Sequence, residues 1–153
     1  MKNPGQRRLR IGRVSETGRV YLVTCVCYRR QPVFADFWAG RCVVQAMRSV
    51  DDLAETLAFV VMPDHLHWLM QLQPGGNLSR AVQKVKGLAS SALVAESRVR
   101  LPIWQRGFHD HALRREEDLA AVARYVVANP LRAGIVDSVG DYPLWDACWL
   151  LWF

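Results

Sequence analysis

The sequence predicts a single α+β domain, residues 1–153, whose central sheet contains at least one antiparallel pair of strands. Strand-like and helix-like segments follow one another in the order strand, helix, two strands, helix, strand, helix, which is typical of α+β proteins. Only Met62-Pro63-Asp64 separates the two consecutive strands, and turn chemistry of this kind predicts a hairpin. A hairpin pairs its strands antiparallel, so the pattern disfavours a doubly wound parallel sheet.

The first half of the chain supplies three strands and one helix. Residues 19–30, RVYLVTCVCYRR, are rich in β-branched and aromatic types and predict the first strand. Apolar residues at helical spacing between about Ala39 and Leu53 predict an amphipathic helix. Residues 56–62, TLAFVVM, form a continuous apolar run, which indicates a central strand covered on both faces. The following HLHWLMQL completes the hairpin.

The second half begins with a Pro-Gly-Gly break. After it, Asn77 or Ser79 caps a helix that runs to about Arg98. Residues 103–113, IWQRGFHDHAL, predict another strand, with an irregularity at Gly107.

The last predicted helix opens with three acidic residues, 116–118, because negative charge in a first turn favours the helix dipole. The pattern LAAVARYVVAN continues the helix until Pro130, which ends or kinks it. Beyond it lies an aromatic and apolar tail, from about residue 141 to residue 153. We expect the tail to dock on the body; an exposed tail would instead mark a partner or self-association surface.

Basic residues dominate the charge of the chain. The net charge is +6, and 17 of the 20 basic residues are arginine, whose planar donor group suits phosphate and guanine edges. An amino-terminal arm, about residues 1–18, contains Arg7, Arg8, Arg10 and Arg13. The arm is either an electrostatic contact for nucleic acid or a solvated tail.

Hydropathy and cysteine usage indicate a cytoplasmic protein. No apolar run approaches the roughly 18 residues that a membrane helix needs, and MKNPGQRRLR lacks the apolar stretch of a secretory signal. We therefore expect no membrane partner, and association with the nucleoid if the partner is DNA. Cys25 and Cys27 lie in an apolar strand pattern and are interpreted as reduced, buried residues.

Two of the four histidines stand two residues apart in the hairpin strand. His65 and His67 share one strand face with Leu69 and Gln71, because side chains alternate along a strand. Two imidazoles on one face supply two ligands for a divalent cation. The alternative is a pair of core histidines that hydrogen bond to the backbone.

The last predicted helix offers a nucleophile and a third ligand. Tyr125 and Asn129 are four residues apart and therefore share a helix face. If this helix packs over the histidines, through Ala121 and Val122, the Asn129 amide completes the metal site beside the Tyr125 hydroxyl. Such a site suits phosphodiester cleavage by tyrosine. Tyr125 as a packing residue, and Asn129 as a helix cap, remain the alternatives.

Other basic residues predict DNA contacts outside this centre. Lys84 and Lys86 lie on the basic helix but on different faces, so one of them is expected to touch DNA and the other to be solvated. Arg106 and Arg114 flank His109 and His111 and would attract phosphate; their charge argues against a second metal site there. Trp104 either stacks on an unpaired base or belongs to the core. The predicted DNA contacts are Arg7, Arg8, Arg10, Arg13, Lys84, Lys86, Arg106, His111 and Arg114.

Several motifs, in this order, resemble those of the HUH (histidine, hydrophobic, histidine) single-tyrosine transposases. They are GRVYLVTCVCYRRQPVF, VVMPDHLHWLM, KVKG, IWQRGFHDHALR and ARYVVANPLRAGIV, and the resemblance covers about residues 7–136. Within that group the sequence is most similar to the REP-associated tyrosine transposases, which act on repetitive extragenic palindromes.

The resemblance implies a ferredoxin-like sandwich with an antiparallel central sheet that carries the HUH motif. It implies binding of single-stranded DNA beside a REP-like hairpin, and cleavage and rejoining through a 5′-phosphotyrosine with release of a 3′-hydroxyl. It assigns His65, His67 and Asn129 to a site for Mg²⁺ or Mn²⁺ and Tyr125 to the nucleophile. Related enzymes often have glutamine where Asn129 stands, and they act as monomers or as homodimers that exchange the tyrosine helix. A water-using metal-dependent hydrolase and a non-cleaving hairpin-binding protein remain the alternatives.

Overall fold

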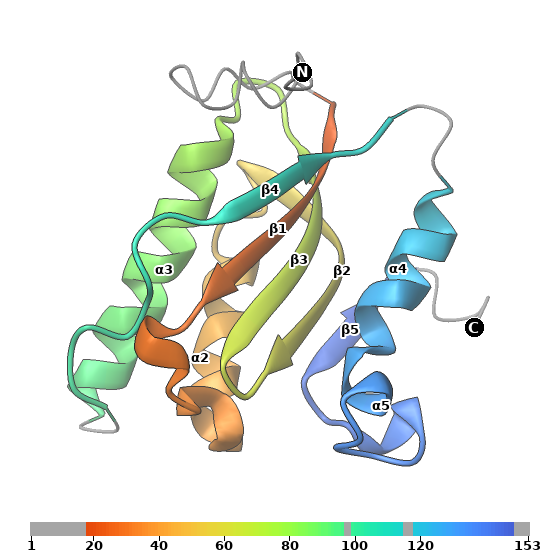
Figure 1. The fold of residues 1–153 in the computed structure, drawn as a ribbon. Helices are drawn as coiled ribbons and strands as arrows, with labels where there is room; N and C mark the ends of the chain where they lie inside the picture. Colours follow the sequence, from red (N-terminus) through yellow and green to blue (C-terminus); the bar gives the residue numbers. More distant parts are fainter. Residues whose placement is uncertain (1–17, 97–98, 115–117, 149–153) are drawn as a thin grey trace.

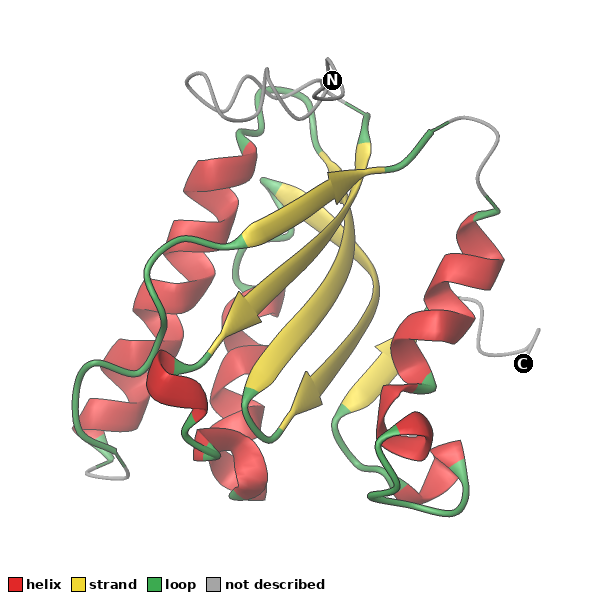
Figure 2. Ribbon diagram, in the orientation of Figure 1, coloured by secondary structure: helices red, strands yellow, loops and turns green. Residues whose placement is uncertain are grey.

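The computed structural model describes residues 18–96, 99–114 and 118–148. Its centre is a five-stranded antiparallel sheet in the order β4-β1-β3-β2-β5 (Figures 1 and 2). The strands are β1 Val20–Val26, β2 Ala54–Met62, β3 His65–Leu72, β4 His109–Ala112 and β5 Trp145–Ala147. The first four strands and their connecting helices follow the order of a ferredoxin-like fold, so the predicted fold class is confirmed.

The helices are α2 Phe37–Arg48, α3 Leu78–Ala95, α4 Leu119–Val127 and the short α5 Asn129–Arg132. Short 3-10 turns cover Tyr28–Arg30, Val33–Ala35 and Val139–Asp141. Side-chain caps fix the helix starts, because their oxygens accept backbone N–H groups that lack an intrahelical partner. Asp36 caps α2, Asn77 caps α3 and Asp118 caps α4. Within the described ranges, no helix has the length and apolarity needed to cross a membrane.

The two faces of the sheet bury different side chains. Leu66, Trp68 and Met70 of β3 lie on the face covered by α2 and α3, in the main core (Figure 1). Leu69, one residue out of phase, packs against Ala123 and Val127 of α4 on the other face. Since side chains alternate along a strand, α4 covers the same face that carries the two hairpin histidines.

Several element boundaries differ from the sequence prediction. The first strand ends at Val26 instead of 30, because Arg29 and Arg30 adopt left-handed backbone angles, with φ of 52° and 51°. The α3 helix ends at Ala95, three residues earlier than expected. Ala121 and Val122 were expected to face the sheet; Val122 is partly buried and packs there, but Ala121 is exposed, and the buried residues of α4 are Ala123, Val126 and Val127.

The predicted strand over residues 103–113 is shorter in the structure. Trp104 makes one isolated bridge to Cys27, and regular pairing begins only at His109. The carbonyls of Gln105 and Gly107 instead accept hydrogen bonds from the Lys86 ammonium, at 3.0 and 2.8 Å. These carbonyls are therefore used by a side chain of α3 and not by a neighbouring strand.

The carboxy-terminal tail contributes a strand that the sequence pattern did not predict. Trp145–Ala147 pairs with β2 and forms the edge of the sheet. The Tyr142 hydroxyl, whose pKa is raised to about 12 by burial, donates a hydrogen bond to the Val61 carbonyl. Residues 141–148 of the tail therefore dock on the body, and residues 149–153 lie outside the described part.

Candidate functional site

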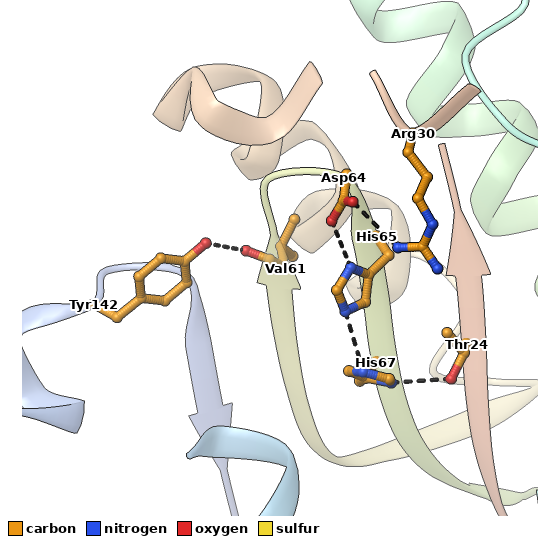
Figure 3. A network of polar contacts seen from close by, with 7 residues as sticks. All are labelled: Thr24, Arg30, Val61, Asp64, His65, His67 and Tyr142. Atoms are coloured by element: carbon orange, nitrogen blue, oxygen red, sulfur yellow. Dashed lines mark hydrogen bonds and ion pairs between the residues drawn. The ribbon is translucent and has the colours of Figure 1, made fainter. Parts of the chain in front are cut away.

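The hairpin histidines meet at the start of β3. Their Nε2 atoms lie 3.2 Å apart, and the rings are nearly perpendicular, with centroids 4.7 Å apart (Figure 3). Both residues are partly buried. The strand period therefore brings the two imidazoles to one point, as the sequence predicts.

The Nδ1 atom of each imidazole lies within hydrogen-bonding distance of a polar side chain, which fixes the orientation of the ring. His65 Nδ1 lies 2.7 Å from the Asp64 carboxylate, and His67 Nδ1 lies 2.9 Å from the Thr24 hydroxyl (Figure 3). The pairing of β1 with β3 places Thr24 directly opposite His67. Partners of this kind fix the orientation of a metal-binding histidine and direct the remaining nitrogen to the ion.

Arg30 extends the network beyond Asp64. Its guanidinium donates to the second Asp64 oxygen at 3.2 Å. Burial alone would raise the pKa of Asp64, but the hydrogen bonds and charges of His65 and Arg30 outweigh it and lower the pKa below its usual value. Left-handed backbone of a non-glycine residue costs roughly 1 kcal/mol or more, and this turn places Arg30 where it reaches the carboxylate.

Burial and nearby positive charges keep the His67 imidazole neutral. Burial, together with the charges of His65 and Arg132, lowers the pKa of His67 to about 4. A neutral imidazole retains the lone pair that a metal ion requires. At neutral pH, protons therefore do not compete for this ligand position.

The donor set fits a divalent ion. Two nitrogens bonded to one ion at about 2.1 Å lie about 3.0 Å apart at a right angle, which matches the 3.2 Å between the Nε2 atoms. Across the described ranges, no three His, Cys, Asp or Glu side chains are grouped to hold a metal. Further ligands would therefore be an amide oxygen, water or a substrate oxygen.

Tyr125 lies on α4, on the same side of the sheet as the histidines. The residue is 57% exposed. The other tyrosines are less accessible: Tyr21 and Tyr142 are buried, and Tyr28 is half-buried at the end of β1. Tyr125 is thus the tyrosine that a polymeric substrate on this face can reach.

Asn129 makes contacts typical of a helix end. Its side-chain nitrogen donates to the carbonyls of Val126, at 2.9 Å, and Tyr125, at 3.4 Å. This is the capping alternative that the sequence left open. The amide nitrogen, not the oxygen, faces the helix, so ligation through Oδ1 stays a prediction.

Arg132 contacts the tyrosine, and the sequence analysis missed it. Its guanidinium carbon lies 3.9 Å from the centroid of the Tyr125 ring, and its charge acts on His67. The sequence offers little signal for this contact, because Pro130 was expected to end or kink the helix between the two residues, and they lie in separate helices, α4 and α5. Thr24, Asp64 and Arg30 were missed as well, since their roles depend on strand pairing and on a backbone turn.

The predicted DNA contacts fall in different environments. Lys84, Arg106 and Arg114 are exposed. Lys86 is buried at 7% exposure, and burial lowers its pKa. Its two carbonyl partners, and the hydrogen bond from the Trp104 indole to the Lys86 carbonyl, indicate a structural role. Trp104 is likewise buried, at 9% exposure.

The second histidine pair lies on the same face of the sheet as the first. His109 is directly opposite Thr24, and His111 is opposite Leu22; opposite residues of an antiparallel pair share a face. Both histidines are exposed. All four histidines of the chain therefore lie on one side. The arm residues Arg7, Arg8, Arg10 and Arg13 lie outside the described residues.

Comparisons with known proteins identify the family of the chain. The family model for "Transposase IS200 like" matches residues 15–129. The chain is 34% identical over 99 residues to a protein named "Putative REP-associated tyrosine transposase" from Haemophilus influenzae, covering 58% of this chain and 56% of that one. It is 31% identical over 90 residues to the REP-associated tyrosine transposase of Escherichia coli K12, covering 58% of this chain and 52% of the relative. The chain thus spans about half the length of these relatives.

The fold has a solved counterpart. The structure described as "Structure of the REP associates tyrosine transposase bound to a REP hairpin" superposes with a TM-score of 0.70 and 26% sequence identity. The match covers 87% of this chain and 79% of the other. With a family model that matches most of its length, the chain belongs to the IS200-like transposase family, and within it resembles the REP-associated tyrosine transposases.

Proposed function

We propose that the chain binds single-stranded DNA beside a REP-like palindromic hairpin and cleaves and rejoins it through a 5′-phosphotyrosine intermediate. The observation that carries this proposal is the packing of α4 on the histidine face of the sheet, which puts Tyr125 and the His65–His67 pair on one side. The hairpin-bound relative of similar fold supports hairpin DNA as the substrate.

The proposed reaction is a transesterification. The Tyr125 oxygen attacks the scissile phosphorus, the new O–P bond forms, and the bond to the 3′-oxygen breaks. The phenol proton passes to solvent, and the leaving 3′-oxygen takes up a proton. Rejoining is the reverse reaction with the 3′-hydroxyl of another strand, so the energy of the phosphodiester is retained.

Different residues are proposed to orient the histidines, to bind the metal ion and to bind the DNA. Asp64 and Thr24 orient the two imidazoles, which would hold Mg²⁺ or Mn²⁺, with the Asn129 amide as the candidate for a third protein ligand. The bound ion supplies Lewis-acid stabilisation of the charge that develops on the phosphate oxygens. Exposed basic residues bind the DNA outside this centre; they are Lys84, Arg106, Arg114 and the arm residues, with His111 on the histidine face.

A gel assay tests the proposal. Wild-type protein is incubated with Mn²⁺ and a labelled hairpin oligonucleotide that carries a single-stranded flank, and the products are separated under denaturing conditions. We expect a covalent adduct that Tyr125→Phe abolishes and the matched control Tyr28→Phe retains. Cleavage without adduct would favour the water-using hydrolase, and binding without cleavage the non-cleaving module.

Two further variants separate chemistry from binding. His65→Ala is expected to abolish the adduct but to spare most of the DNA affinity, since the histidines serve the ion. Deletion of residues 1–13 is expected to weaken binding and to reduce its dependence on salt concentration, because fewer counterions are released. Equal loss of cleavage and affinity in His65→Ala would contradict this division.

The same packing supports a monomer that is complete in itself. Because α4 lies on the sheet of its own chain, a monomer contains all the residues of the proposed site. A homodimer that exchanges α4 is the alternative. Light scattering at the concentration of the adduct assay distinguishes the two.

A further inference from the structure

Arg132 stacks on the ring of the proposed nucleophile, Tyr125. It is the last residue of α5, and its guanidinium covers the Tyr125 ring at 3.9 Å. Hydrogen bonds from the Arg132 amide to the Ala128 carbonyl, and from the Ile135 amide to the Pro130 carbonyl, fix the backbone on both sides. The backbone that carries this side chain is therefore held in the short helix α5, which directly follows the helix that carries the tyrosine.

Arg132 also differs from neighbouring arginines in its partners. Arg30 pairs with Asp64 at 3.2 Å, and Arg124 approaches Asp118 at 3.9 Å. Within residues 18–96, 99–114 and 118–148, no carboxylate forms an ion pair with Arg132. The ring occupies one face of the guanidinium, and the N–H donors lie around its edge in its own plane. An exposed, unneutralised arginine on this side of the sheet remains able to bind an anion.

The anion expected at this position is a DNA phosphate. An arginine fork matches two phosphate oxygens, and each charge-assisted hydrogen bond is stronger than a neutral one. A substrate phosphate attacked by the Tyr125 hydroxyl must approach the same ring on which Arg132 stacks. A stack on tyrosine alone is worth only about 0.5 to 1 kcal/mol at an exposed site, which leaves the charge available for the substrate.

We propose that Arg132 binds the scissile phosphate and holds it against the Tyr125 hydroxyl, which makes it a catalytic residue of the reaction proposed above. This inference rests on the proposed function. Arg132 stays protonated throughout. It stabilises the charge on the non-bridging phosphate oxygens and transfers no proton, so the bonds made and broken are those of the transesterification.

Binding to neutral phosphate analogues tests the contact directly. In a Tyr125→Phe background, which keeps an aromatic ring under the guanidinium, affinity is measured by fluorescence anisotropy. The oligonucleotides carry a single uncharged methylphosphonate at each position of the single-stranded flank in turn.

We expect Arg132→Gln to weaken binding of the all-phosphate oligonucleotide by about 10-fold. It should have no effect when the methylphosphonate replaces one particular phosphate. Arg124→Gln, one residue from the tyrosine, is the matched control and should act equally on all oligonucleotides. A uniform or absent effect of Arg132→Gln would overturn the proposal.

The rate of adduct formation provides the second readout. In single-turnover experiments with Tyr125 intact, Arg132→Gln is expected to slow the adduct by about 10²- to 10³-fold. Arg132→Lys should restore part of the rate, and millimolar guanidinium ion should rescue Arg132→Ala. If Arg132 had only a structural role, added guanidinium would not restore the rate of Arg132→Ala. A failed rescue would refute the contact if Arg132→Gln also showed the same methylphosphonate sensitivity at every position as the protein with Arg132 intact.

Different results would contradict the proposed function and the proposed role of Arg132. If wild-type protein forms no adduct, the proposed function is wrong, while the methylphosphonate scan still decides whether Arg132 binds one phosphate. If the adduct forms equally fast in wild type and Arg132→Gln, the proposed function stands and the role of Arg132 is wrong.

Discussion

The hydrogen bond between Asp64 and His65 is expected to control metal affinity. The carboxylate oxygen lies 2.7 Å from Nδ1, and the interaction keeps the ring turned so that Nε2 points to His67. Removing a carboxylate that orients a ligand histidine typically weakens metal binding 10- to 100-fold. The Asp64 side chain is 29% exposed, so water replaces part of its effect.

We therefore expect Asp64→Ala to weaken Mn²⁺ binding by about 10- to 30-fold, or about 1.4 to 2 kcal/mol. Asp64→Asn keeps an oxygen acceptor but loses the charge, and its effect should be smaller, about three- to tenfold. Arg30→Gln removes only the exposed outer contact and should change the affinity about twofold or less. Asp52→Asn, in the exposed turn after α2, is the matched control.

Isothermal titration calorimetry with MnCl₂ and the signal of free Mn²⁺ in electron paramagnetic resonance both measure this affinity without DNA. Circular dichroism confirms that each variant is folded. If Asp64→Ala binds Mn²⁺ as tightly as wild type, the carboxylate does not position His65 for an ion. If wild-type protein binds no Mn²⁺ at millimolar concentrations, the metal site itself is wrong.

The remaining predictions concern stability and accessibility. Because the pKa of His67 falls to about 4 in the folded protein from 6.5, the unfolded chain binds more protons between these values. The free energy of unfolding, measured by urea titration in EDTA, should therefore be highest above pH 6.5 and should fall by up to about 3 kcal/mol as the pH is lowered to 4. His67→Gln should reduce this dependence on pH. Lys86→Met should lower stability by roughly 2 to 4 kcal/mol, since two carbonyls lose a charged donor, whereas Lys84→Gln should weaken DNA binding with little change in stability. The opposite pattern would mean that Lys86 reaches DNA. Burial raises the pKa of Cys25 and Cys27 to about 12, so a thiol reagent should label them only after denaturation; rapid labelling of either in the native protein would contradict the packing of β1.

Strand parity is the part of the site that the sequence predicted well. Leu66, Trp68 and Met70 are large apolar residues at alternate positions, so their burial against α2 and α3 determines which way the intervening histidines point. Alternation of side chains along the strand is then enough to predict that the two imidazoles lie close together. The exposure of Tyr125 also follows from a local pattern, because Ala123, Val126 and Val127 form the buried stripe of α4.

Features that depend on contacts between distant segments escaped the sequence analysis. The buried position of Lys86 depends on where residues 105 and 107 lie relative to α3, and a helix pattern alone suggests only a basic surface. The shortened first strand depends on two left-handed arginines, although local propensity favours a strand through Arg30. The three-residue β5 was missed because so short a segment gives no periodic signal.

Hydrophobic packing on one face of the sheet and chemistry on the other are linked through the register of β3. A slip of one residue would turn Trp68 toward α4 and the imidazoles into the main core, where neither metal nor DNA can reach them. Trp68 is fully buried, and its indole donates to the Thr56 hydroxyl at 2.8 Å. Burying a large side chain contributes about 2 to 3 kcal/mol, so the slipped register loses this contact together with those of its neighbours. The packing on α2 and α3 therefore holds the histidines on the face of the sheet that α4 covers, and a site built on a strand is positioned more rigidly than the same residues on a loop.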